Sequence, residues 1–228
     1  MKRLLPLLLI FCALLIADET ALYRVDFTGQ PDGDAKPWLK RHGFKMLLDT
    51  EQMRLTFDHG RLVIETDGRK TALFGIEFST KSYLHDVGRV RIEWGVERFP
   101  KGSNWEKGRN RLAIGALIVL GTKKLSSGLP FGINAAPYFL GPFIGEKEKV
   151  GKRYKGVLYH EGGRYYCVSN RNHGTTVVTD FDIDEAFRSA FNKKSTPPVT
   201  AFGFQMNTKD CESGAKAFIK RIVFYGKP

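Results

Sequence analysis

Hydrophobic residues alternate with polar ones along much of this chain, most regularly between Arg89 and Phe99. The apolar members of that segment share one parity, namely Val90, Ile92, Trp94 and Val96. Successive side chains of a β-strand point to opposite faces, so this pattern predicts a strand with one buried and one polar face. A chain built from such segments folds as sheets rather than as a bundle of helices.

The alternation recurs in segments that are separated by turn-forming residues. Segments at 23–27, 53–57, 62–64, 74–78, 154–160, 164–169, 175–180, 200–206 and 217–225 follow it, and 112–120 is apolar on both faces, as in a central strand. Turns at 58–60 and 161–163 predict two hairpins, since glycine tolerates the positive φ of a tight turn. We predict an all-β fold, a two-sheet antiparallel β-sandwich of jelly-roll or concanavalin-like type, as one domain over residues 22–228.

One segment departs from the period of two. Ile183, Phe187 and Phe191 recur every four residues, which predicts a short helix near 182–192. Asp182, followed three residues later by Glu185, resembles a capping box at its start.

The first 21 residues predict an export signal. Lys2 and Arg3 precede an apolar run from Leu4 to Ala17, too short to span a bilayer and typical of a secretory signal peptide. Cleavage after Ala17 or Ala21 would leave a small residue at the cut. An uncleaved anchor and a lipidated Cys12 are the alternatives. We expect a periplasmic or secreted protein, with no integral membrane segment in the mature chain.

Export bears on the two remaining cysteines and on the charge. In an oxidising compartment Cys167 and Cys211 predict a disulfide, and two buried free thiols are the alternative. The net charge of +12 favours anionic partners. For an exported chain these are glycans or other anionic envelope polymers, and we expect no nucleic acid.

The order of several short motifs resembles a family of exported bacterial proteins known as domain of unknown function 3047. The motifs are a strand that ends near Trp38, the strand 91–94 followed by Phe99-Pro100, a charged loop, an apolar strand from Arg111, the segment 181–191, and the stretch 205–210 before the last strand. The resemblance implies a sandwich similar to carbohydrate-binding jelly rolls, and no known activity.

No residue pattern predicts catalysis. Glu93 and Glu97 share one strand face, but at four residues' separation they would lie about 13 Å apart, too far for a glycosidase pair. No histidine pair has metal-ligand spacing, no nucleophile elbow occurs, and we expect neither cofactor nor metal. Asp32 and Asp34 form a turn that could instead hold Ca²⁺.

A polar loop that carries a tryptophan supplies the candidate ligand site. Asn104, Trp105, Arg109 and Arg111 combine an aromatic ring with groups that bond sugar hydroxyls, unless Trp105 folds back onto the core. We therefore expect a non-catalytic sandwich that binds a glycan or an anionic envelope polymer. A polysaccharide hydrolase and a structural envelope subunit remain the other hypotheses.

Overall fold

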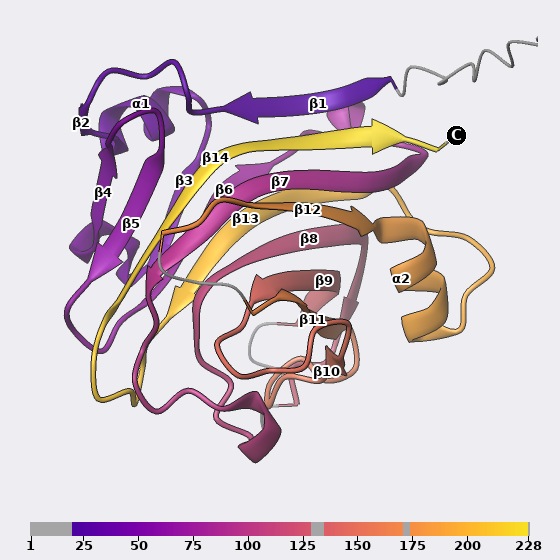
Figure 1. Ribbon diagram of the computed structural model, residues 1–228. Coiled ribbons are helices and arrows are strands. Elements are labelled where there is room, and N and C mark those ends of the chain that lie inside the picture. Colours follow the sequence, from indigo (N-terminus) through magenta and orange to yellow (C-terminus); the bar gives the residue numbers. More distant parts are fainter. Residues whose placement is uncertain (1–19, 129–134, 171–173, 228) are drawn as a thin grey trace, which may run out of the picture.

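The strands of the protein form two sheets that lie face to face (Figure 1). The computed structural model describes residues 20–128, 135–170 and 174–227. Sheet A consists of β1 (Ala21–Asp26), β2 (Gly33–Asp34), β4 (Arg54–Phe57), β5 (Leu62–Thr66), β7 (Val87–Arg98), β12 (Val177–Asp182) and β14 (Ala215–Gly226). Sheet B consists of β3 (Lys45–Leu48), β6 (Thr71–Glu77), β8 (Leu112–Leu125), β9 (Ala136–Ile144), β10 (Arg153–Tyr154), β11 (Gly163–Ser169) and β13 (Val199–Asn207). The predicted two-sheet β-sandwich is confirmed.

Both sheets are almost wholly antiparallel and join strands that are distant in sequence. Sheet A runs β12-β7-β14-β5-β4-β2, and β1 pairs with the second half of β14 where β5 has ended. Sheet B runs β10-β11-β9-β8-β13-β6-β3. Among the strands described, β9 and β11 form the one parallel pair. Consecutive strands such as β6, β7 and β8 therefore cross between the sheets and tie them together.

The period of two in β7 places its apolar residues in the core between the sheets. Val90, Ile92, Trp94 and Val96 are fully buried there. The indole of Trp94 keeps its polar atom satisfied, because Nε1 donates to Thr179 Oγ1 of β12 at 3.0 Å. The core extends along the chain from Val25 in β1 to Phe224 in β14.

The helices lie at the margins of the sandwich. They are α1 (Lys36–Arg41), α2 (Ile183–Phe191) and the 3₁₀ turns Asp49–Gln52, Thr80–Ser82 and Trp105–Lys107. The predicted helix is confirmed as α2, whose cap Asp182 accepts a hydrogen bond from the amide of Glu185 at 2.7 Å. Across the described part of the chain, the helices are too short or too polar to cross a membrane.

The second predicted hairpin is confirmed in its antiparallel pairing of β10 with β11, but its predicted first strand over 154–160 is wrong. Only Arg153 and Tyr154 form a strand before β11, and they pair with Tyr166 and Tyr165. The following residues leave the sheet in a long turn, closed where the amide of Gly163 donates to the carbonyl of Tyr159 at 2.7 Å. Short-range alternation cannot distinguish such a loop from a strand.

The predicted disulfide between Cys167 and Cys211 is also wrong, because both cysteines are free and buried. Cys167 lies in β11, where it packs with Trp105 and Phe143 and its thiol donates to the carbonyl of Ser169 at 3.4 Å. Cys211 lies in the turn before β14, outside that cluster.

Residues 1–19, including Cys12, lie outside the described residues. Of the predicted signal peptide only Thr20 and Ala21 are described, and Ala21 pairs with Tyr225 as the first residue of β1.

Candidate functional site

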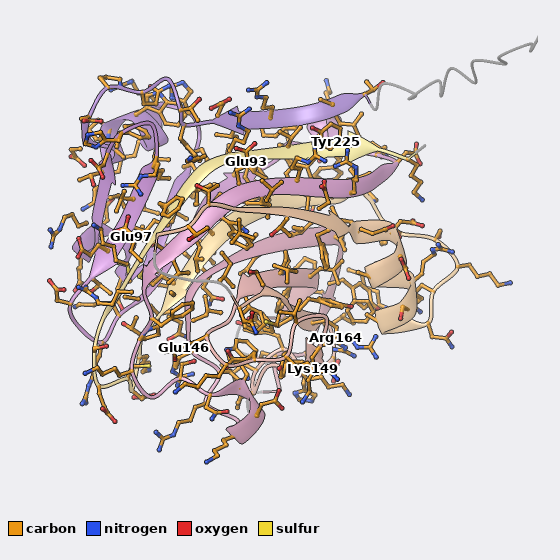
Figure 2. The ribbon with its side chains drawn as sticks, viewed as in Figure 1. Glu93, Glu97, Glu146, Lys149, Arg164 and Tyr225 are labelled. Atoms are coloured by element: carbon orange, nitrogen blue, oxygen red, sulfur yellow. The ribbon has the colours of Figure 1, made fainter. Side chains whose placement is uncertain are left out.

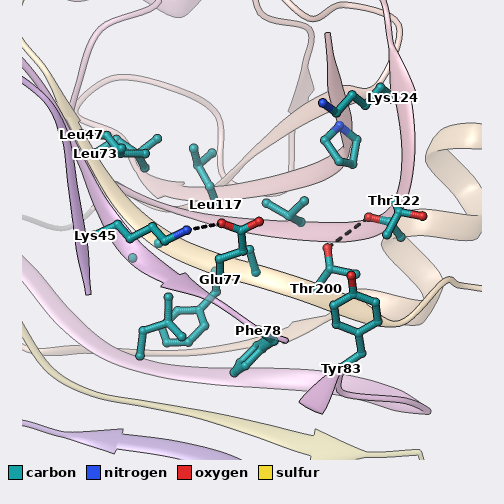
Figure 3. Close-up of a pocket in the computed structure, with 18 residues that line it drawn as sticks. Lys45, Leu47, Leu73, Glu77, Phe78, Tyr83, Leu117, Thr122, Lys124 and Thr200 are labelled. Atoms are coloured by element: carbon teal, nitrogen blue, oxygen red, sulfur yellow. Dashed lines mark hydrogen bonds and ion pairs between the residues drawn. The ribbon is translucent and has the colours of Figure 1, made fainter. Parts of the chain in front are cut away.

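The outer face of sheet B is hollowed into a groove of about 370 Å³ (Figure 3). Strand register explains which side chains line it, since paired residues of neighbouring strands share a face. Lys45 pairs with Gly75, Gly75 with Gly203, and Gly203 with Leu117. This row, which we call the central row, crosses β3, β6, β13 and β8 in turn.

Two further rows flank the central one. Glu77, Ala201 and Val119 lie on one side of it, and Leu47 and Leu73 on the other. The rows give the groove a floor of small and aliphatic residues. Leu47 is 47% exposed, which shows how far this apolar surface lies open to solvent.

Glycines at the centre of the floor are required by the approach of two backbones. A Cβ on Gly75 would lie 2.2 Å from the carbonyl oxygen of Phe202, and one on Gly203 would lie 2.8 Å from that of Phe74. Any other residue would force β6 and β13 apart, as expected where a strand glycine marks a close contact. The same two glycines leave the middle of the groove free of side chains.

Polar groups lie at the two ends of the groove. Lys45 Nζ and Glu77 Oε2 form an exposed ion pair at 2.5 Å, and they point toward each other from β3 and β6 in Figure 3. Thr122, Lys124, Thr200 and Tyr83 lie toward the opposite end. The Thr200 hydroxyl donates to the carbonyl of Gly121 at 3.1 Å, which leaves its lone pairs able to accept. The groove thus offers an apolar floor with donors and acceptors at both ends.

The sequence-predicted site residue Trp105 is buried rather than presented to a ligand. Only 5% of it is exposed, and its ring stacks on Phe143 of β9 with the centroids 4.6 Å apart. Its Nε1 donates to the carbonyl of Arg111 at 2.8 Å. Trp105 therefore packs on the outer face of sheet B, over β9 and β11. This is the alternative stated above, in which the ring folds back onto the protein.

The other three predicted residues shape the same loop. Asn104 Oδ1 accepts from the amide of Lys107 at 3.1 Å and so caps the 3₁₀ turn. Arg111 Nη2 donates to Asp210 Oδ2 at 2.8 Å, and this guanidinium keeps the pKa of the Asp210 carboxyl below its usual range. Arg109 is exposed beside them. The structure brings the four residues together, but as a folded loop whose aromatic ring is covered.

A buried carboxylate holds that loop against its neighbour. Glu148 is 3% exposed and accepts from the amides of Trp105 at 3.1 Å, Glu146 at 2.9 Å and Lys147 at 3.1 Å. Three backbone donors compensate its charge, as buried ionised groups require.

Glu93 and Glu97 lie on the outer face of β7 in sheet A, where Figure 2 labels them, whereas the groove lies on sheet B. Glu97 forms ion pairs with Arg61 at 2.9 Å and with Lys216 at 2.7 Å, while Glu93 forms an ion pair with Arg221 at 3.1 Å. Their interpretation as a charged strand face is confirmed.

Asp32 and Asp34 do not converge on one point. Asp34 Oδ1 accepts from the amide of Lys36 at 3.1 Å, and Asp32 Oδ1 accepts from that of His59 at 2.8 Å. Asp32 instead lies with Asp58 and His59, whose ligand atoms are all within 4.8 Å. His59 Nδ1 and Asp58 already bond each other at 2.6 Å, so this turn carries no metal proposal.

Sequence reasoning missed the groove, although two signals for it were present. Gly75 and Gly203 interrupt strand patterns, which marks close backbone approach. Leu117 and Val119 make 112–120 apolar on both faces, which predicts a doubly buried strand, but one of its faces is the groove floor.

No family model and no curated protein sequence matches the chain. Among solved structures, it is similar to a family 29 carbohydrate-binding module from Piromyces equi, with 10% identity, a TM-score of 0.40 and coverage of 90% of this chain and 91% of that one. It is similar to the carbohydrate recognition domain of Emp46p (Y131F mutant), with 11% identity, a TM-score of 0.48 and coverage of 92% and 99%. It is also similar to a legume lectin-like domain from Entamoeba histolytica, with 11% identity, a TM-score of 0.43 and coverage of 93% and 100%. At these scores the likenesses support no inference about ligand or chemistry.

Proposed function

We propose that the protein is a non-catalytic glycan-binding protein whose ligand lies across the outer face of sheet B. The observation that carries this proposal is the groove itself: an open, apolar-floored hollow with polar groups at its two ends. Its volume, its largely apolar lining and its few polar groups are those of ligand-binding hollows in general.

A glycan matches the groove because both are amphipathic. The C–H faces of a sugar ring can lie on Leu73, Leu117 and Val119, while its hydroxyls meet Lys45 and Glu77. From β3 to β8 the groove crosses three inter-strand spacings, about 14 Å at roughly 4.8 Å each. That length suits an extended ligand better than a single small molecule.

Binding fits the groove better than hydrolysis does. Glycoside hydrolysis uses two carboxyl groups about 5–9.5 Å apart across the scissile bond. Among the described residues that line the groove, Glu77 is the one acid, and Lys45 is already its partner.

A second candidate ligand is an acyl chain, which the exposed aliphatic surface at Leu47 favours. An acyl chain would contact the aliphatic floor of the groove and would form few contacts with the Lys45–Glu77 ion pair. The two candidates therefore respond differently to removal of the polar groups.

The test removes the ion pair without changing net charge. In the double variant Lys45→Ala/Glu77→Ala we expect the affinity for glycans selected on a neutral and acidic oligosaccharide array to fall by about tenfold or more, since hydrogen bonds to charged groups are lost. The matched control is Lys40→Ala/Glu51→Ala, which removes an equally exposed pair at 2.7 Å near α1. Calorimetric titration of both variants measures the affinities.

Three results would decide against a glycan in the groove. They are an array and a peptidoglycan pull-down without signal, equal affinity of the groove variant and wild type, and equal loss in the control. Saturable palmitate binding that survives in the groove variant would favour the acyl chain instead.

We also propose that the chain is exported, on the strength of residues 1–21. N-terminal sequencing of protein recovered from the cell envelope or medium should begin after Ala17 or Ala21. Recovery with Met1 intact would contradict cleavage.

A further inference from the structure

Arg164 of β11 is a buried cation without a carboxylate beside it. Only 8% of the residue is exposed, and Figure 2 shows it between the lower strands of sheet B and α2. Throughout residues 20–128, 135–170 and 174–227, no carboxylate oxygen lies within 4.0 Å of its guanidinium. Buried charges are ordinarily paired, because removing an ion from water is costly.

One nitrogen of the guanidinium has a structural role. Nη1 donates to the carbonyls of His160 and Gly163, each at 2.7 Å, and to that of Glu161 at 3.5 Å, and so holds the turn before β11. The Phe191 ring of α2 lies 4.8 Å from the guanidinium carbon. These contacts hold Arg164 in place, but three carbonyl dipoles and a ring do not cancel a full charge.

The other side of the guanidinium is unused. Nε and Nη2 donate no hydrogen bond to any residue in the described ranges, and neither atom is sealed from solvent. They are the two parallel donors with which arginine holds both oxygens of one carboxylate or phosphate group.

Arg164 lines a pocket of about 470 Å³ between sheet B and α2. Tyr138 of β9 and Phe191 of α2 contribute aromatic walls, and Lys193 adds a second cation. Glu161 also lines the pocket, but it is exposed and forms no ion pair with Arg164. Burial lowers the pKa of the Arg164 guanidinium, and the like charge of Arg153 lowers it further. Arg153 is therefore another cation near the pocket.

We propose that this pocket, the Arg164 pocket, binds an oxyanionic group, either a carboxylate or a phosphate, through Nε and Nη2 of Arg164 with Lys193 as the outer cation. The pocket shares no lining residue with the groove on sheet B, so the proposal is independent of the glycan proposal. An anion there would supply the counter-charge that the fold itself does not provide.

The test is calorimetric titration of the full folded protein with two probes, inorganic phosphate and glucuronate, at constant ionic strength. We expect saturable binding of at least one probe, and the probe that binds identifies the class of anion. Arg164→Met should weaken it by about tenfold or more, because a charge-assisted pair of hydrogen bonds is lost. Arg98→Met, which removes an arginine already paired with Asp67 at 2.7 Å, is the control and should bind as wild type does.

Lys193→Met keeps the test decisive if Arg164→Met fails to fold, since Lys193 is exposed and its loss should leave folding intact. Its affinity for the probe should fall by a few-fold. Absence of saturable binding to both probes in wild type would overturn the proposal. So would binding that survives Arg164→Met, or that is unchanged in Lys193→Met.

Discussion

Asp26 fastens β1 to the rest of sheet A, and its ionisation should contribute measurably to stability. Its side chain is 25% exposed and pairs across the strands with Arg221. Thr28 donates to it twice, from the amide at 2.9 Å and from the hydroxyl at 2.6 Å, and Arg24 bonds it as well. Burial raises the pKa of this carboxyl, but the hydrogen bonds from Thr28 and Arg24 and the charge of Arg221 outweigh it and lower the pKa to about 2.

The magnitude follows from the distance between this pKa and the ordinary value of 3.8. At about 1.4 kcal/mol per pKa unit, ionised Asp26 stabilises the fold by about 2 kcal/mol. Because the folded-state pKa is the lower one, this stabilisation is complete above pH 4 and is lost as the pH falls toward 2. Asp26→Asn should therefore lower the free energy of unfolding by about 2 kcal/mol at pH 7 and by only about 0.4 kcal/mol at pH 2, where the folded-state carboxyl is half protonated.

Urea unfolding followed by tryptophan fluorescence from pH 2 to pH 7 measures the difference, since guanidinium salt would screen the charges. Asp67→Asn is the control. It removes a carboxylate that is 73% exposed from its ion pair with Arg98, and should cost less than about 1 kcal/mol. A stability gap between Asp26→Asn and wild type that stays constant across this pH range would refute the reasoning.

Two further outcomes concern the aromatic cluster and the cysteines. Trp105→Ala should lower the free energy of unfolding by about 3–5 kcal/mol in urea, because a buried, stacked ring is removed; a loss below about 1 kcal/mol would mean that the ring is not buried in solution. Burial raises the pKa of the Cys167 thiol to about 11 and also raises that of Cys211, so both should react slowly with a thiol reagent in the native state. When protein without residues 1–21 is unfolded without reductant, two thiols should become reactive toward the reagent. If no thiol reacts, Cys167 and Cys211 form a disulfide.

The strands and α2 could be predicted from sequence because their burial follows a local period. β7 shows a period of two and α2 a period of four, and both periods arise from the geometry of a single element. Pairing is not local. The neighbours of β14 are β1, β5 and β7, and no pattern within β14 specifies them. The loop after Tyr154 alternates like a strand but finds no partner strand beyond that residue, so it does not become one.

The site could not be predicted for the same reason. Leu47, Leu73, Gln205, Gly115 and Phe143 form one continuous row across sheet B, contributed by five different strands. Only the register of those strands shows that they share a face.

The loop that carries Trp105 divides this face into two parts. At the Phe143 end of the row, the Trp105 ring covers the sheet and closes an aromatic cluster. At the Leu47 end, the floor is aliphatic and glycine-rich, and it stays open. From the sequence, a polar loop with one tryptophan suggests a ligand-binding surface. Here the Trp105 ring packs on the sheet beneath it, and the groove cannot extend past the part of the sheet that the ring covers. The surface left for a ligand is therefore set by where that loop ends.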